Sequence, residues 1–101
     1  MLKRLLIFGL ILNSSLASAS IRIDRIEMKR DRGYDYLDIY TTGYSEAKGL
    51  LLEDKLYIDF PGAVLSPKLR ISKKRSSRVR DIAASQKDER TARVIVSLKR
   101  N

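Results

Sequence analysis

The sequence predicts an all-β chain, a small β-sandwich of two short antiparallel sheets. Apolar and polar residues alternate along most of its segments, which is the pattern of half-buried strands. Turn residues separate these segments at short intervals, and almost none of the segments has helical spacing. Together these observations predict six to eight short strands in one small domain.

The first predicted strand runs from Ile21 to Met28, and its alternation changes phase at Asp24–Arg25, as a β-bulge requires. The polar segment Arg30–Gly33 predicts a hairpin tip. Tyr34–Thr42, rich in aromatic and β-branched residues, is the second strand. Glu46–Leu52 is a shorter strand that ends at an acidic turn.

The clearest strand is Lys55–Phe60, where every second residue is apolar. Pro61–Gly62 ends it, because proline lacks a ladder donor and glycine permits turn dihedrals. Ala63–Leu65 and Leu69–Ile71 are expected as two separate short strands, since Ser66–Pro67 breaks the pattern between them.

The last third of the chain has one ambiguous segment. Val79–Ala84 has helical apolar spacing but is short, so a helix and a strand both fit it. Gln86–Arg90 is expected as a polar loop, and Ala92–Leu98 as the final strand. Stacked sheets would bury the apolar face of Ala92–Leu98 together with that of Lys55–Phe60.

Residues 1–19 are predicted to be a secretory signal peptide, which leaves 20–101 as a single β domain. Lys3 and Arg4 precede the apolar run Leu5–Leu12, and Ala17–Ala19 has the small-x-small cleavage pattern. A membrane anchor is the alternative, but the apolar run is far shorter than the roughly 20 residues that span a bilayer. We expect cleavage before Ser20 and no membrane span afterwards.

Composition limits the function. Without the two basic residues of the leader, 19 Lys and Arg remain against 12 Asp and Glu, a net charge of +7. In an exported protein this charge favours anionic envelope polymers, lipid headgroups or acidic proteins over nucleic acid. The chain has no cysteine or histidine, so the usual zinc ligands, Ser-His-Asp triads and Cys-His pairs are excluded. We expect no enzyme, no cofactor and no metal site.

Four segments resemble the AMIN domain. Leu56–Leu65 is similar to its signature of a hydrophobic strand, Asp, an apolar residue and Pro-Gly. Val79–Gln86 and Thr91–Leu98 resemble the family's "I-R-x-x-Q" and "T-R-V-V-L-D-L" stretches, and Ile21–Thr42 its opening strands. Ser97 departs from the pattern, because an acidic residue is common there.

The resemblance implies a β-sandwich and a place in the periplasm or at the cell surface. It also implies a non-catalytic targeting role, as in the AMIN domains of N-acetylmuramoyl-alanine amidases and type IV pilus secretins. The expected partner is peptidoglycan, another anionic envelope polymer, or an envelope protein complex.

A second departure from the family is a run of seven basic residues without an acid. They are Lys68, Arg70, Lys73, Lys74, Arg75, Arg78 and Arg80. As a binding site, their arginines would grip carboxylates or phosphates with paired donors, while the lysines supply point charge. The alternative is a solvated, mobile loop whose charge aids solubility.

Tyr36, Tyr40 and Tyr57 alternate with apolar residues, so they are the tyrosines expected on exposed faces, where they would stack on sugar rings. Ordinary strand propensity is the alternative explanation. Asp59 is expected to accept structural hydrogen bonds rather than bind a ligand, with Arg93 as a candidate cross-strand partner.

Three functions fit the sequence. The first is an exported AMIN-like module that docks on peptidoglycan or an envelope complex. The second is an interaction subunit that adds an edge strand to a secretin or an amidase. The third is a truncated N-terminal piece of a larger cell-wall amidase.

Overall fold

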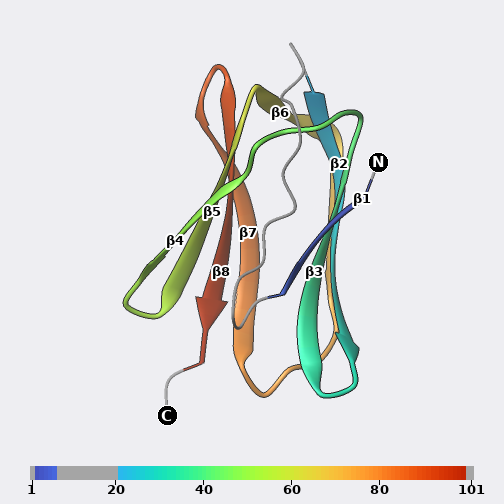
Figure 1. Ribbon diagram of the computed structural model, residues 1–101, viewed down its shortest axis with the longest axis vertical. Coiled ribbons are helices and arrows are strands. Elements are labelled where there is room, and N and C mark those ends of the chain that lie inside the picture. The colour runs from blue at the N-terminus through green and yellow to red at the C-terminus, as the bar shows by residue number, and fades with distance from the viewer. Residues whose placement is uncertain (1, 7–20, 100–101) are drawn as a thin grey trace.

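The computed structural model describes residues 2–6 and 21–99, which fold into two stacked β-sheets (Figure 1). Sheet A has the strand order β1-β3-β2-β6 and sheet B the order β4-β5-β8-β7. The strands are β1 (Leu2–Leu6), β2 (Ile21–Asp31), β3 (Tyr34–Thr41), β4 (Lys48–Leu52), β5 (Lys55–Pro61), β6 (Ala63–Lys73), β7 (Val79–Asp88) and β8 (Thr91–Leu98). The described residues contain no helix, and so none that could cross a membrane. The predicted all-β sandwich is confirmed.

β1 falls inside the predicted signal peptide. It pairs antiparallel with β3 at the edge of sheet A, with Leu2 opposite Tyr40 and Leu6 opposite Tyr36. The rest of the predicted leader, including the cleavage pattern Ala17–Ala19, lies outside the described residues. The signal peptide and the domain boundary after it therefore stay predictions.

The β2–β3 hairpin has the expected irregularity and the expected tip. Its register shifts between Ile23 and Arg25, which confirms the predicted bulge. At the tip, Arg32 and Gly33 have φ angles of 52° and 81°. Positive φ at both central residues gives a two-residue turn the twist that antiparallel strands need.

The prediction of two short strands separated by Ser66–Pro67 is wrong, because β6 is one strand from Ala63 to Lys73. Pro67 is tolerated for two reasons. β6 is an edge strand, so a missing N–H removes no ladder bond on the solvent side. Moreover, Pro67 lies where the pairing with β2 jumps from Leu65 to Arg70, so the proline sits in an irregular stretch.

The chain passes from sheet B to sheet A at Pro61–Gly62, where Gly62 has a φ of 78° that favours glycine. The Gly62 N–H donates to the Arg90 carbonyl (2.6 Å), and the Gly62 carbonyl accepts from the Ile21 N–H (3.0 Å). The buried Ser45 hydroxyl donates to the Pro61 carbonyl (2.7 Å). Because of this crossing β6 runs parallel to β2, whereas the other strand pairs are antiparallel as predicted.

Val79–Ala84 is a strand and not a helix, as part of β7. β7 continues to Asp88, so most of the predicted loop Gln86–Arg90 is strand and only a two-residue turn remains. The pairing explains the extension, since Asp88 lies opposite Thr91 at the start of β8.

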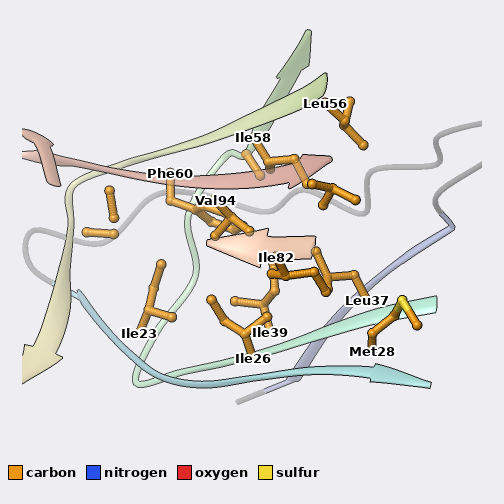
Figure 2. Close-up of a cluster of buried hydrophobic side chains, with 14 of the residues drawn as sticks. Ile23, Ile26, Met28, Leu37, Ile39, Leu56, Ile58, Phe60, Ile82 and Val94 are labelled. Atoms are coloured by element: carbon orange, nitrogen blue, oxygen red, sulfur yellow. The ribbon is translucent and has the colours of Figure 1, made fainter. Parts of the chain in front are cut away.

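The core lies between the sheets, where side chains of β2 and β3 point toward those of β5, β7 and β8 (Figure 2). The expected burial of the β5 and β8 faces is confirmed, but the two strands are neighbours within sheet B. Their apolar faces therefore pack side by side against sheet A. The buried hydrophobic residues are Ile21, Ile23, Ile26, Met28, Leu37, Ile39, Ala47, Leu56, Ile58, Phe60, Ala63, Val79, Ile82, Ala92, Val94 and Val96.

One side chain joins the edges of the two sheets. Gln86 of β7 accepts a hydrogen bond from the Leu65 N–H (3.0 Å) and donates one to the Ala63 carbonyl (2.9 Å). The amide of Gln86 thus pairs with the outer backbone of β6 as a neighbouring strand would. It satisfies two backbone groups at an edge where strand pairing ends.

We expect Gln86→Ala to lower the free energy of unfolding by about 1 kcal/mol, because both hydrogen bonds are lost at a partly solvated site. Urea unfolding monitored by circular dichroism measures the change. Ser85→Ala is the matched control, since Ser85 is exposed on the same strand. Equal stability of the two variants would contradict the bridging role.

Candidate anion-binding site

All seven basic residues of the predicted patch are exposed. Three lie on β6 (Lys68, Arg70 and Lys73), three in the loop to β7 (Lys74, Arg75 and Arg78), and Arg80 is on β7. The structure does not gather all seven. Lys68 instead lines a separate hollow with Arg22 and Asp24, near the middle of β6.

Two distant segments add cations to the β6–β7 loop. Arg30 and Arg32 come from the tip of the β2–β3 hairpin, and Lys99 follows the end of β8. Figure 1 shows the hairpin tip and the β6–β7 loop together at the lower end of the sandwich. We call this surface the basic end, and it comprises Arg30, Arg32, Lys73, Lys74, Arg75, Arg78 and Lys99.

Hydrogen bonds hold these three segments against one another. The Lys74 N–H donates to the Met28 carbonyl (3.2 Å), which fixes the end of β6 beside β2. The Arg78 guanidinium donates to the Gly33 carbonyl at the hairpin tip (3.5 Å), and the Lys99 N–H donates to the Arg78 carbonyl (2.8 Å).

A buried serine anchors the loop itself. The Ser76 hydroxyl donates to Asp35 Oδ2 (2.8 Å) and accepts from the N–H groups of Arg78 and Val79 (3.0 Å each). The Lys99 ammonium donates to the Ser76 carbonyl. Sequence reasoning missed this anchor because Asp35 is 41 residues away. The basic loop is therefore tied to the core at its centre.

Most cations of the basic end have no ionic partner. Within residues 21–99, no carboxylate lies within 4.0 Å of Arg30, Arg32, Lys73, Lys74 or Arg75. Five basic side chains elsewhere on the sandwich are paired with Asp24, Glu27, Asp38 or Asp59, and they are Arg22, Arg25, Lys29, Lys87 and Arg93. Unpaired like charges on one surface raise its potential and attract anions.

A hollow of about 400 Å³ opens between the ends of β2 and β6. Lys73 and Lys74 line it together with Glu27 and Lys29. Glu27 is already paired with Arg25 (3.1 Å) and Lys29 (3.3 Å), so its charge is compensated. The two unpaired lysines therefore make this hollow suitable for a carboxylate or a phosphate.

The three tyrosines predicted to stack on sugars do not share a surface. Tyr36 and Tyr40 lie on the outer face of sheet A, whereas Tyr57 lies on that of sheet B, and all three are half-buried. The Arg25 guanidinium covers the Tyr40 ring at 4.1 Å, and that of Arg93 lies 5.3 Å from the Tyr57 ring centre. Sugar stacking stays a prediction, and no common platform supports it.

Asp59 accepts structural hydrogen bonds, as expected. Arg93, directly opposite on β8, donates to both of its oxygens (2.7 and 3.1 Å), and Lys87 adds a third bond (3.2 Å). The Arg93 guanidinium, helped by Lys87, lowers the pKa of the Asp59 carboxyl below its ordinary value of 3.8. No group of three or more acidic side chains among the described residues is placed to hold a metal ion.

Two stacked sheets with a cluster of exposed cations at one end define a small domain of the β-sandwich class. The family model of the AMIN domain matches residues 25–101, and the chain belongs to this family. AMIN domains are non-catalytic modules of amidases and secretins that target peptidoglycan or the cell envelope, and they occur in periplasmic proteins. Comparisons with curated proteins and with solved structures find no match.

The family's motif residues have structural roles in this chain. Pro61–Gly62 forms the crossing between the sheets, and Gln86 joins their edges. Asp59 pairs strand β5 with β8. The residues of the basic end are not among these motif residues.

We expect Ser76→Ala to lower the free energy of unfolding by about 1–3 kcal/mol, because it leaves the buried Asp35 carboxylate without its hydroxyl donor. Chemical denaturation measures this loss. Ser77→Ala is the control, since Ser77 is the exposed neighbour in the same loop. A Ser76→Ala protein as stable as the Ser77→Ala protein would refute the anchor.

Stability should also depend on Asp59 in acid. Because the folded protein lowers the pKa of Asp59, the ionised carboxylate stabilises the fold above pH 3.8. This contribution, about 0.5–1 kcal/mol for a partly exposed pair, is lost as the pH falls through the lowered pKa. Asp59→Asn should therefore flatten the stability profile below pH 4, and Asp81→Asn, at an exposed position of β7, is the matched control.

Proposed function

We propose that this chain is a non-catalytic module that docks on peptidoglycan in the cell envelope through its basic end. Its membership of the AMIN family supports an envelope-targeting role. The observation that carries the choice of surface is the group of unpaired cations around a loop anchored by Ser76.

The chemistry of the basic end suits carboxylates presented by a polymer. Peptidoglycan stem peptides carry carboxylates, which guanidinium groups bind with two parallel hydrogen bonds. A single exposed ion pair contributes only about 0.2–1 kcal/mol, so stable docking requires several contacts at once. A repeating anionic polymer supplies them, because each contact raises the effective concentration for the next.

A second candidate function is docking to an envelope protein, such as a secretin or an amidase, by addition of an edge strand. The exposed edge strand β4 favours it. A third hypothesis is that the chain is an N-terminal piece of a larger cell-wall amidase. A gene whose open reading frame continues past Asn101 would support it.

Retention on purified cell-wall sacculi tests the proposal. Replacing Lys73, Lys74 and Arg75 by Gln should reduce retention at least tenfold at low salt. Retention of the unaltered protein should fall as salt rises, because salt screens exposed charges. The matched control replaces Lys55, Lys68 and Arg90 by Gln, the same loss of charge at exposed positions away from the basic end.

Two outcomes would refute docking through the basic end. One is retention by the Lys73/Lys74/Arg75 variant that equals that of the control variant. The other is binding to sacculi only in the presence of a co-purifying envelope protein, which would favour the second candidate.

A further inference from the structure

The edge strand β4 is the most exposed apolar element of the described residues. Leu50, Leu51 and Leu52 are 57%, 57% and 54% exposed. β4 pairs with β5 on one side, and none of the described strands pairs with its other side. A row of backbone donors and acceptors therefore lies open next to three consecutive leucines.

The edges at β6 and β7 carry protecting features within the strand, whereas β4 has only Gly49 and leucines between Lys48 and its acidic turn. Gln86 occupies part of the outer side of β6, which also carries Pro67. β7 ends in the charged residues Lys87 and Asp88. Proteins normally protect edge strands with charges, prolines or covering segments, because open edges pair with other strands. An unprotected leucine edge is therefore suited to pairing with a further strand.

The leucines of β4 present apolar surface on both sides of the strand. Leu50 lies opposite Tyr57, on the outer face of sheet B, and lines a hollow of about 380 Å³ with Leu52 and Tyr57. Leu51 lies opposite Leu56, on the other side. Leu51 is exposed there, on the β4–β5 hairpin that projects at the side of the sandwich in Figure 1.

We propose that β4 is a dimerisation edge, at which a second copy of this chain adds its own β4 antiparallel. The two sheets B would then form one continuous eight-stranded sheet across a two-fold axis. Such an interface is closed, so it makes dimers and not filaments.

The charges of the edge complement themselves in this arrangement. β4 begins at Lys48 and ends at the acidic turn Glu53–Asp54, with only Gly49 and leucines between. Antiparallel pairing brings Lys48 of each copy near the acidic turn of the other, and leucines face leucines. Opposite charges therefore attract each other at both ends of the paired strands. A parallel arrangement would place like charges side by side.

The dimer should be weak and concentration-dependent. The shared edge is five residues long, and interfaces that bury less than about 1,200 Å² in total are typical of transient complexes. Because the two-fold axis reverses the strand direction, the basic ends of the two copies point in opposite directions.

Cysteine cross-linking tests the pairing directly, because the chain contains no cysteine of its own. When two β4 strands pair antiparallel about a two-fold axis, one residue near the middle of β4 lies directly opposite the same residue of the other copy. If the outer faces of both sheets B lie on the same side of the joined sheet, this residue is Leu50 or Leu51, and its two copies are within reach of a disulfide. Leu50→Cys or Leu51→Cys should give a covalent dimer under mild oxidation. Val64→Cys is the control, since Val64 is an exposed apolar residue on β6.

Sedimentation equilibrium of the full chain gives a second, independent measurement. We expect reversible dimers whose dissociation constant rises at least tenfold in Leu51→Lys, with circular dichroism confirming that this variant folds. A chain that stays monomeric at millimolar concentration overturns the proposal, as does cross-linking no faster than in Val64→Cys. Binding of an unrelated strand-forming peptide to β4, without any dimer of this chain, also overturns the proposal.

This inference stands apart from the docking proposal. The Lys73/Lys74/Arg75→Gln variant should dimerise like the unaltered protein, because none of these residues belongs to β4. A failure of dimerisation would leave the retention on sacculi unaffected.

Discussion

The crossing at Pro61–Gly62 is the constraint on which the rest of the sandwich depends. No disulfide can join the two sheets, since the chain has no cysteine. The sheets are held by a small apolar core and by the chain where it passes between them. Gly62 takes a backbone conformation that L side chains rarely adopt. Three hydrogen bonds fix this corner: Ile21 and Ser45 donate to it, and the Gly62 N–H donates to the Arg90 carbonyl.

The same crossing determines where the charges go. Because β6 leaves the corner parallel to β2, both strands end on the same side of the molecule. The end of β6 therefore lies beside β2, where Lys74 bonds to Met28, and Arg78 of the following loop reaches Gly33 at the β2–β3 tip. The cationic surface thus combines the basic β6–β7 segment with cations from distant parts of the chain, which the fold brings together.

Local patterns in the sequence predict the strands, the bulge at Asp24–Arg25 and the Asp59–Arg93 pair, because alternation, phase and facing positions are local or pairwise properties. These local patterns do not predict structure that depends on contacts between residues far apart in the sequence. From the sequence alone, Pro67 predicts the end of a strand, because only the structure shows that β6 is an edge strand. The Ser76 anchor and the contributions of the β2–β3 tip and Lys99 to the basic end depend on tertiary contacts, which one sequence does not contain.

The Ser76 anchor has a consequence for the entropy of binding. Fixing the backbone of one residue costs about 1–2 kcal/mol in conformational entropy. In the β6–β7 loop this loss occurs during folding, because the hydroxyl of Ser76 ties the loop to Asp35 and to two backbone N–H groups. A ligand that meets the loop therefore has only side chains left to order. Ser76 therefore pre-organises the loop without needing to touch the ligand. The entropy cost of ordering the loop backbone is not subtracted from the affinity of the surface for its ligand.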